Sequence, residues 1–351
     1  MSRCLELAAH GRGNVAPNPM VGAVIVADGK IIGEGFHRCF GEAHAEVNAI
    51  ESVRDESLLR RATLYVNLEP CSHSGKTPPC AELIIRKQIP RVVAACLDPY
   101  PEVAGRGIKM LRDAGIAVET GVMEREAIRL NRFFMTAHQR HRPYIILKWA
   151  QSADGYIDRH RTDASEKPFA FSIPTTRMMM HRLRSEVQAI MVGTNTAVLD
   201  NPELTVRHWA RKSPVRVLID RQLRVPPDYR LFDGKQQTFV FTQKTGMNRE
   251  NVHYFVDDSW TLKTVIDTLY KKGIHSLLVE GGAQLHRSFL NENLWDELII
   301  ETAPVLLKDG IKSPHLSSIK YAQLTDKQFF YSDSTGHEKP SVTERFLNFI
   351  I

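Results

Sequence analysis

The most informative stretch of this sequence runs from His44-Ala45-Glu46 through Pro70-Cys71 to Cys80. One imidazole and two thiolates are the ligand set of a catalytic zinc, because three protein ligands leave the fourth tetrahedral position to water. Zinc lowers the pKa of that water toward neutrality. Glu46 follows His44 by two residues, where a carboxylate that does not bind the metal can carry protons to a ring nitrogen and a leaving amine. The pattern predicts a zinc-dependent deaminase of a nucleobase-like ring.

The context and spacing of the cysteines refine this prediction. His44 opens one predicted helix and Cys80 another, so the positive helix ends favour ionised thiolates. A structural zinc would need a fourth protein ligand, for which His73 is the candidate, and that ligand would close the catalytic position. Eight residues separate Cys71 from Cys80, whereas the general deaminase pattern has two. The long spacer therefore indicates a particular subgroup of zinc deaminases.

Length and composition indicate a two-domain globular protein. The chain has 351 residues, 43% of them hydrophobic and 25% charged, and a single core rarely serves so long a chain. No run approaches the roughly 18 apolar residues of a membrane span, and no apolar signal core follows Met1. The five cysteines, an odd number, do not suggest a disulfide framework. We therefore expect a cytoplasmic protein without membrane contact.

The net charge of +6 bears on the kind of partner. The sequence lacks a dense Lys/Arg tract with interleaved aromatic residues, which disfavours a nucleic-acid partner. A small phosphorylated substrate is compatible with a few well-placed basic residues. We expect such a substrate, no nucleic acid, and a homo-oligomer.

Strand and helix patterns alternate along the chain, which predicts an α/β fold with helices on both faces of a sheet. In the first part we expect strands at residues 21–27, 31–36, 63–68 and 91–97, with a hairpin turn at Asp28-Gly29, and helices at residues 43–53, 81–87 and 108–114. Residues 127–141 read as polar, basic and helical, and Pro143 ends that pattern. We therefore expect domains at residues 1–143 and 144–351. In the second we expect strands at residues 144–149, 189–192, 215–219, 238–241 and 276–279, and helices at residues 263–272 and 284–290.

Several long motifs resemble a single family, in that family's order. They are residues 16–24, 44–50 and 70–80 in the first domain and residues 147–148, 152–155, 181–184, 192–196, 200–207 and 279–282 in the second. They resemble the bifunctional riboflavin-biosynthesis deaminase/reductase family. The resemblance implies an N-terminal cytidine-deaminase-like three-layer domain and a C-terminal dihydrofolate-reductase-like α/β domain. It also implies zinc-dependent deamination of 2,5-diamino-6-ribosylamino-4(3H)-pyrimidinone 5′-phosphate, followed by NADPH-dependent reduction of the ribosyl group of 5-amino-6-(5-phosphoribosylamino)uracil.

The same resemblance implies substrate contacts in the deaminase domain, at Asn18, His37, Lys76 and Asp98. A mobile ammonium such as that of Lys76 suits a phosphate, although a solvated loop lysine is an equally good interpretation. Asn18 lies between prolines, where its amide can read a ring edge or simply form a turn. His37 could be a surface histidine at a strand end, and Asp98 could simply begin a turn. The family usually has Asn where this chain has Tyr100, so we transfer no contact to that position.

The second domain has no Gly-x-Gly-x-x-Gly after a strand, so a Rossmann domain is not indicated. Two glycine-bearing turns follow apolar strands instead, and such turns let a backbone approach phosphate closely. With the resemblance they look like a cradle for the cofactor pyrophosphate. The implied cofactor contacts are Ala150, Gly193, Thr196, Asp200, Gly281 and Gly282. The implied substrate contacts are Lys148, Arg184, Leu204, Arg207 and Glu280, where a guanidinium fork matches phosphate oxygens.

One departure from the family leaves an alternative open. The family usually has a Ser-x-Trp-Ile-Thr-like segment before the helix that holds residues 181–184, and this chain has a longer stretch without Trp from Asp163 to Pro174. The alternative is a monofunctional zinc deaminase with an inactive or altered reductase domain. Two further interpretations are a nucleic-acid deaminase with an inert second domain, and a non-catalytic scaffold with a structural zinc. A nucleic-acid deaminase predicts a two-residue cysteine spacer. A structural-zinc scaffold predicts a fourth protein ligand and no use for Glu46.

Overall fold

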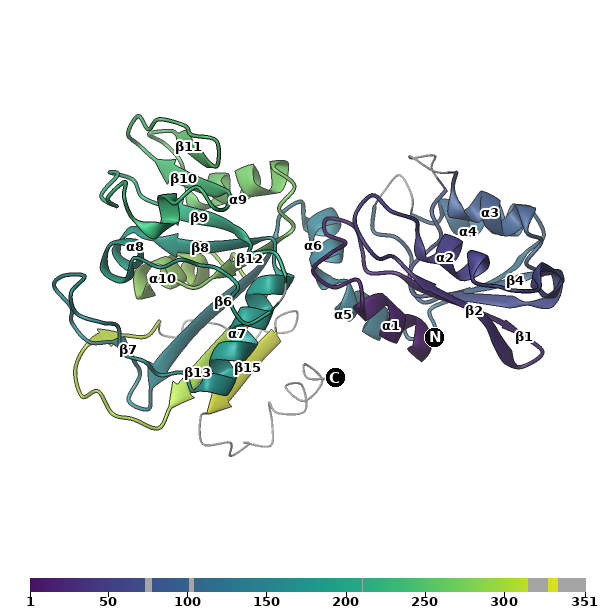
Figure 1. The fold of residues 1–351 in the computed structure, drawn as a ribbon, viewed down its shortest axis with the longest axis horizontal. Coiled ribbons are helices and arrows are strands. Elements are labelled where there is room, and N and C mark those ends of the chain that lie inside the picture. Colours follow the sequence, from purple (N-terminus) through teal and green to yellow (C-terminus); the bar gives the residue numbers. More distant parts are fainter. Residues whose placement is uncertain (73–77, 101–103, 210, 315–327, 334–351) are drawn as a thin grey trace. The chain divides into compact units, whose positions relative to one another are not determined.

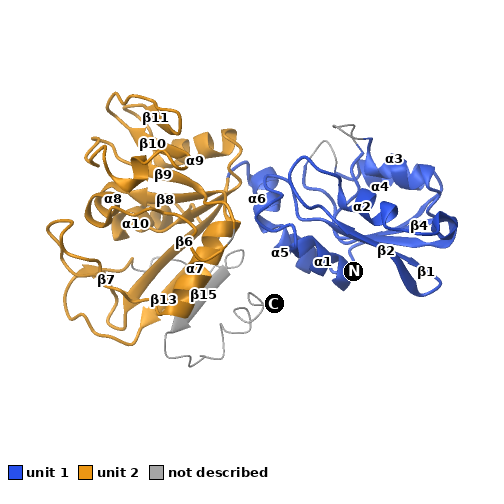
Figure 2. Cartoon of the chain, viewed as in Figure 1, with its two compact units in different colours: residues 1–142 blue, residues 143–351 orange. Residues whose placement is uncertain are grey.

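The structure is a computed structural model, and it describes residues 1–72, 78–100, 104–209, 211–314 and 328–333. The chain divides into two compact units, residues 1–142 and residues 143–351 (Figure 2). Within the described ranges, no helix is both long and apolar enough to cross a membrane. Lys76 and His73 lie outside the described residues, so the structure does not bear on them.

The first unit is built on a five-stranded sheet with the order β2-β1-β3-β4-β5. Its strands are β1 (Gly22–Ala27), β2 (Lys30–Phe36), β3 (Thr63–Val66), β4 (Arg91–Ala94) and β5 (Ala117–Thr120). β1 pairs antiparallel with β2 and β3, whereas β3, β4 and β5 are parallel. The turn between β1 and β2 has positive φ at Asp28 and Gly29, as a type I′ hairpin requires. The predicted hairpin is therefore confirmed.

Side-chain alternation along β1 divides the first unit into three layers. Ala23 and Ile25 belong to one core with residues of α2 (Ala45–Glu51), α3 (Cys80–Arg86) and α4 (Arg106–Asp113). Val24 points the other way, into a smaller core with Cys4 and Leu7 of α1 (Ser2–Ala9). Successive strand residues face opposite sides, so helices cover both faces of the sheet (Figure 1). A 3-10 helix, η1 (Glu56–Arg61), precedes β3.

The helical stretch expected over residues 127–141 is present, but as two helices, α5 (Glu124–Leu130) and α6 (Arg132–Arg140). The break falls at Asn131, which has φ −96° and ψ 22°. Its side chain accepts the amide of Met20 at 2.8 Å and donates to the carbonyl of Met20 at 2.9 Å. Asn131 is buried, and this pair of bonds ties the helix junction to the loop before β1.

The second unit is built on an eight-stranded sheet with the order β11-β10-β9-β8-β12-β6-β13-β15. All of its strand pairs within the described residues are parallel. The strands are β6 (Tyr144–Ser152), β8 (Ala189–Gly193), β9 (Val215–Ile219), β10 (Thr238–Thr242), β11 (Val252–Val256), β12 (Ser276–Val279), β13 (Glu297–Ala303) and β15 (Gln328–Asp333). Short strands β7 (Tyr156–Asp158) and β14 (Ile311–Lys312) form a separate antiparallel pair.

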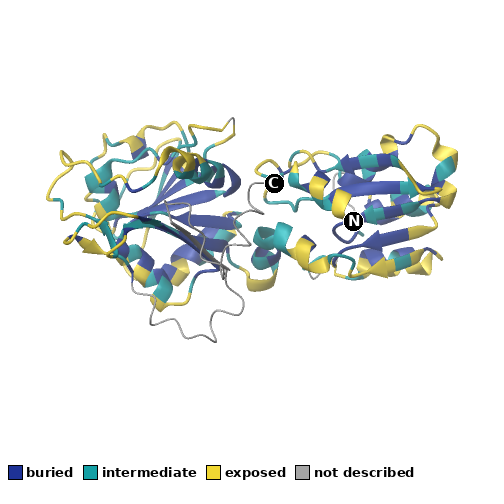
Figure 3. Ribbon diagram, turned by 90° about the horizontal axis from the view of Figure 1, so that it is seen from below, coloured by how far each residue is buried: buried dark blue, intermediate teal, exposed yellow. Residues whose placement is uncertain are grey.

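Helices cover both faces of this second sheet as well. Ile145, Leu147 and Trp149 of β6 pack with α9 (Leu262–Lys271) and α10 (Ala283–Asn291). The alternate residues of β6 face the side that carries α7 (Pro174–Glu186), while α8 (Thr194–Asp200) follows β8, and the 3-10 helix η2 (Arg230–Phe232) follows β9. The strands of both units are largely buried, whereas exposed residues gather on helices and loops (Figure 3). The carboxyl ends of β6, β8, β12 and β13 thus lie at one edge of a buried sheet, where α/β folds place their sites.

Candidate functional site

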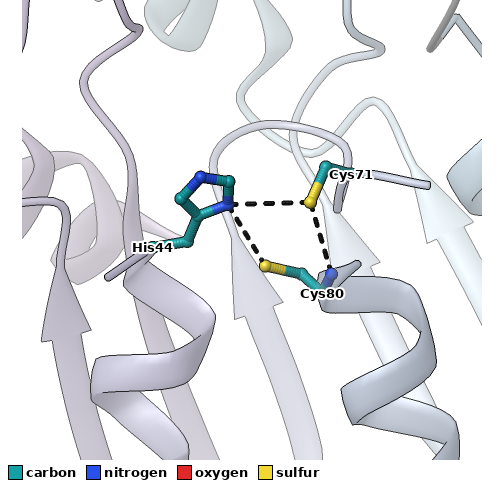
Figure 4. Close-up of side chains that lie close together, drawn as sticks. All are labelled: His44, Cys71 and Cys80. Atoms are coloured by element: carbon teal, nitrogen blue, oxygen red, sulfur yellow. Dashed lines mark hydrogen bonds between the residues drawn. The ribbon is translucent and has the colours of Figure 1, made fainter. Parts of the chain in front are cut away.

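Three element ends bring the predicted zinc ligands together. His44 caps the N-terminus of α2, Cys71 lies shortly after β3, and Cys80 is the first residue of α3. The Nδ1 atom of His44 lies 3.6 Å from Sγ of Cys71 and 3.3 Å from Sγ of Cys80. Figure 4 shows the ring and both sulfur atoms turned toward one another. All three donor atoms lie within 4.8 Å of each other.

These separations fit a tetrahedral zinc ion. Zn–S bonds of about 2.3 Å and Zn–N bonds of about 2.0–2.1 Å place nitrogen and sulfur ligands about 3.5 Å apart. The observed 3.6 and 3.3 Å agree with that separation. Thiolate and imidazole donors are also the set that zinc prefers. Among the described residues, which do not include His73, no fourth His, Cys, Asp or Glu joins the cluster.

The three donors are electrostatically coupled. A hydrogen bond with Cys80 lowers the pKa of the Cys71 thiol, and the backbone N–H of Cys80 donates to Cys71 Sγ at 3.3 Å. The contact with Cys71 raises the pKa of the Cys80 thiol and that of the His44 imidazole. Ligands must lose their protons to bind zinc, so metal and protons compete for this cluster.

Glu46 lies beside the ligands, in the first turn of α2. Its side chain is buried, with 3% of the residue exposed. Burial raises the pKa of Glu46 to about 7, and the nearby Cys71 thiolate adds to that shift. A divalent cation bound to the cluster would lower this pKa again. Before a metal binds, Glu46 is therefore a carboxyl group whose proton can be gained or lost near neutral pH.

Asn18 and His37 form a hydrogen-bonded pair in the same unit. Nδ2 of Asn18 lies 3.2 Å from Nε2 of His37, and Nδ1 of His37 lies 3.0 Å from the carbonyl oxygen of Ala43. A carbonyl only accepts, so Nδ1 of His37 carries the proton and Nε2 accepts from the Asn18 amide. Burial lowers the pKa of His37, which keeps the ring neutral. His37 is only 3% exposed, so it holds Asn18 with Oδ1 as the free end of the amide.

Sequence reasoning missed Glu69, a buried carboxylate between β3 and Cys71. Its oxygens accept the backbone amides of Asp98, Gly105, Gly107 and Ile108 at 2.9–3.2 Å. Glu69 thereby ties the loop of the predicted contact Asp98 to the chain just before a zinc ligand. A charged residue directly after an apolar strand was the available signal. Tyr100, which departs from the family, packs edge-on against His138 with ring centroids 5.3 Å apart.

In the second unit, two glycine turns meet at the carboxyl ends of adjacent strands β8 and β12. Gly193 caps α8, and Gly282 caps α10 with φ +71°. A Cβ on Gly281 would lie 2.9 Å from the Val192 side chain, and one on Gly282 would lie 3.3 Å from Oγ1 of Thr196. The structure therefore brings together four of the six predicted cofactor contacts, and only glycine allows the two turns to approach this closely.

Arg184 and Glu280 form a bidentate ion pair next to the second of these turns. Nε and Nη2 of Arg184 donate to the Glu280 carboxylate at 2.8 and 2.5 Å, and Nη1 donates to the carbonyl of Thr205. Burial raises the pKa of Glu280, but the attraction of Arg184 and Lys148 outweighs burial and leaves that pKa lowered. Glu280 is therefore ionised, and three predicted substrate contacts, Lys148, Arg184 and Glu280, form one charged group.

The other predicted reductase contacts lie on β6, at the end of α8 and in the segment that follows α8. Leu204 is buried and has φ +52°. Arg207 is exposed, pairs with Glu203 at 3.0 Å, and lines a pocket of about 520 Å³ with Pro174, Arg177, Met178, His181 and His208. Asp200 ends α8 and accepts from Arg161 at 2.5 Å. Ala150 of β6 is paired in register with Glu301 of β13.

The segment that departs from the family is anchored to the sheet by Glu301. Ser172 donates to this carboxylate at 2.5 Å and Thr176 at 2.7 Å. Glu301 is 3% exposed, and ionised acceptors make strong hydrogen bonds. Sequence reasoning missed Glu301, because a lone acidic residue in a strand carries no local signal. The altered segment is therefore held at the carboxyl end of β13, where Glu301 is paired in register with Ala150 of β6.

Comparisons with known proteins cover both units. Residues 1–96 match the cytidine and deoxycytidylate deaminase zinc-binding region, and residues 143–328 match the RibD C-terminal domain. The chain is 40% identical over 318 residues to the riboflavin biosynthesis protein RibD of Aquifex aeolicus, covering 89% of this chain and 88% of that protein. It is 42% identical over 329 residues to RibD of Bacillus amyloliquefaciens, covering 91% and 87%.

Solved structures agree with the sequence relatives. The crystal structure of a diaminohydroxyphosphoribosylaminopyrimidine deaminase/5-amino-6-(5-phosphoribosylamino)uracil reductase from Thermotoga maritima superposes with a TM-score of 0.82, at 39% identity and over 89% of this chain and 88% of that one. Acinetobacter baumannii RibD gives a TM-score of 0.81 at 36% identity, over 91% and 90%. The predicted fold class, a cytidine-deaminase-like domain followed by a reductase domain, is confirmed, and the monofunctional alternative is not favoured. This chain belongs to the RibD family of riboflavin biosynthesis proteins, which join a zinc-dependent deaminase to an NADPH-dependent reductase.

Proposed function

We propose that the first unit carries the deaminase site, with His44, Cys71 and Cys80 as zinc ligands and Glu46 as the proton carrier. The convergence of one nitrogen and two sulfur donors beside a buried carboxyl group supports this assignment most directly. Zinc in such a site lowers the pKa of a water molecule toward neutrality. Glu46, buried in the first turn of α2 beside the zinc ligands, is suited to take a proton from water and return it to the leaving amine.

The proposed substrate is 2,5-diamino-6-ribosylamino-4(3H)-pyrimidinone 5′-phosphate. Deamination replaces an exocyclic amine by a carbonyl oxygen that comes from water, and ammonia leaves. Asn18, held by His37, would accept an N–H of the pyrimidine through its free Oδ1. Asp98 and Lys76 are the further proposed substrate contacts, with the Lys76 ammonium on the phosphate.

The second unit is proposed to reduce the deaminated product, 5-amino-6-(5-phosphoribosylamino)uracil. NADPH supplies the hydride. Gly193, Thr196, Gly281 and Gly282 would receive the cofactor phosphates at two neighbouring turns, and Ala150 and Asp200 would complete the cofactor contacts. Lys148, Leu204 and Glu280 would hold the substrate. Arg207 and the free edge of the Arg184 guanidinium would meet its phosphate.

The remaining assignments concern the setting in which the enzyme works. We propose small phosphorylated pyrimidines and no nucleic acid as partners, because no basic tract with interleaved aromatic residues is present in the sequence. We further propose a homo-oligomer in the cytoplasm. A reducing compartment keeps Cys71 and Cys80 available as metal ligands.

Product mass analysis tests this function directly. The zinc-loaded protein is incubated with the diaminopyrimidine ribosylamine phosphate, with and without NADPH. We expect deaminated product in both reactions and the ribitylamino product only with NADPH. Deamination without any reduction would refute the role of the second unit, and the absence of both products would refute the substrate assignment.

A further inference from the structure

His286 lies on α10 beneath the turn of residues 280–282, and the proposed chemistry does not use it. It is 1% exposed. Its Nδ1 lies 3.0 Å from the carbonyl oxygen of Gly282, and its Nε2 lies 3.1 Å from the carbonyl oxygen of Val279. The indole of Trp149 packs against the ring with centroids 5.2 Å apart. A buried imidazole therefore spans the two carbonyl groups that flank Glu280-Gly281.

A neutral ring can donate to only one of these two carbonyl oxygens, so its tautomer decides which of them it bonds. Burial lowers the pKa of His286 to about 4, so the neutral ring has one N–H to donate. Whichever nitrogen carries that hydrogen, it bonds a carbonyl at one end of the turn. The Gly282 carbonyl also accepts the backbone amide of His286 at 3.2 Å. The Gly282 carbonyl thus already has a donor, so we assign the imidazole N–H to the Val279 carbonyl at the end of β12.

With the Val279 carbonyl held by the ring and the Gly282 carbonyl by the backbone amide of His286, the amide on the opposite side of each peptide is fixed as well. In a planar trans peptide the C=O and N–H point in opposite directions. The amide of Glu280, opposite the Val279 carbonyl, donates to the Met191 carbonyl of β8 at 3.0 Å. The amide of Ala283, opposite the Gly282 carbonyl, points away from His286 at the start of α10. The imidazole thus orients the backbone from which the turn presents its donors.

We propose that His286 is a positioning residue of the reductase, which holds the Glu280-Gly281-Gly282 turn in the conformation that receives the cofactor. The proposal rests on the proposed reductase function of the second unit. His286 touches neither substrate nor cofactor in this role. It acts through the turn, whose Glu280 side chain is also held by Arg184.

The test compares His286→Phe and His286→Gln with wild type. Phe keeps a ring against Trp149 but removes the hydrogen bond, whereas the Gln amide can still donate to a carbonyl. His253→Phe is the matched control, because His253 lies on β11 and its ring faces Phe239. All four tryptophans lie in residues 143–351, so quenching of their fluorescence reports NADPH binding to the second unit alone. Deamination by the same chain measures the amount of chain whose first unit is folded, and the NADPH stoichiometry measures the folded fraction of the second unit.

We expect His286→Phe to weaken NADPH binding roughly tenfold, the effect of losing one net hydrogen bond. The binding stoichiometry and deaminase rate should stay at wild-type values, and His286→Gln should recover most of the affinity. Reduced stoichiometry with an unchanged dissociation constant in both variants would overturn the proposal, because His286 would then serve folding only. Wild-type affinity in both variants would overturn it too. A wild-type protein that does not bind NADPH would instead refute the reductase function itself.

Discussion

Three carboxylates with little solvent exposure, Glu46, Glu69 and Glu280, show how the surroundings of one residue type decide its task. Glu69 accepts four backbone amides, and Glu280 is paired with Arg184. Fixed donors hold both carboxylates, and Arg184 keeps the pKa of Glu280 low. Glu46 lies among thiols and an imidazole instead, and burial raises its pKa to about 7. Of the three, only Glu46 is placed to exchange a proton near neutral pH.

Glu46→Gln should abolish deamination while zinc remains bound. The amide has the shape of the carboxyl group but cannot carry a proton, and loss of general acid–base catalysis costs about 10²–10⁴-fold in rate. The ligands lie on other residues, so zinc content measured by atomic absorption should stay at the wild-type value. Reduction of the deaminated substrate should also be unchanged.

Glu42→Gln is the matched control for this variant, because Glu42 is exposed and lies just before the ligand His44. It should deaminate at the wild-type rate. Deamination by Glu46→Gln at a comparable rate would refute the proton-carrier role. Loss of zinc from Glu46→Gln would show that the carboxylate supports the metal rather than the proton transfer.

At the scale of elements, the sequence was most informative where one segment carries its own pattern. The expected strands at residues 215–219 and 276–279 coincide with β9 and β12. β13 was missed because Glu297 and Glu301 interrupt its apolar pattern. Both acidic residues accept hydrogen bonds from distant parts of the chain, Glu301 from Ser172 and Thr176, and Glu297 from Tyr144. Such long-range compensation cannot be read from a local window.

The same distinction between local patterns and long-range contacts applies to the candidate sites. His44, Cys71 and Cys80 stand at the ends of short elements, so their spacing along the sequence already predicts that they converge. The bond from Asn18 to His37 and the ion pair of Arg184 with Glu280 join segments whose proximity only the fold determines. The resemblance predicted that these residues contact substrate, but only the structure shows which residues they bond to.

Glu301→Ala should loosen the N-terminal end of α7. Ser172 and Thr176 would lose the carboxylate they share, and hydrogen bonds to charged groups are worth about 1.5–3 kcal/mol each. We expect the second unit to lose roughly 2–3 kcal/mol of its free energy of unfolding. Glu301→Gln should lose less, because its amide oxygen still accepts one hydroxyl. Urea unfolding followed by tryptophan fluorescence measures the effect.

Glu292→Ala provides the comparison, since Glu292 is exposed just beyond α10. Its unfolding midpoint should match that of wild type. An unchanged midpoint in Glu301→Ala would mean that the two hydroxyl bonds do not anchor the helix. If the KM for NADPH rises more in Glu301→Ala than in Glu301→Gln, as the loss of unfolding free energy should, the hydrogen bonds to Glu301 also support the proposed cofactor contact at Ala150.

At the scale of the whole molecule, each compact unit has a sheet and a hydrophobic core of its own. The core of the first unit draws its residues from β1, β3, β4 and helices α2 to α4, whereas that of the second draws on β6 to β13 with α9 and α10. The proposed zinc ligands all belong to the first unit, and the proposed NADPH contacts all belong to the second. Each activity should therefore survive damage to the other site.

Cys80→Ser tests that independence. A serine hydroxyl is a poor zinc ligand beside one imidazole and one thiolate, so the variant should lose its zinc and, with it, deamination. Reduction of the deaminated substrate should continue at the wild-type rate, because Cys80 contributes only to the core and site of the first unit. Cys39→Ser, which alters a partly exposed cysteine outside the metal cluster, should keep zinc and both activities. If Cys80→Ser lost both activities while remaining folded by tryptophan fluorescence, the reductase would depend on an intact zinc site, and the assignment of one independent activity to each unit would fail.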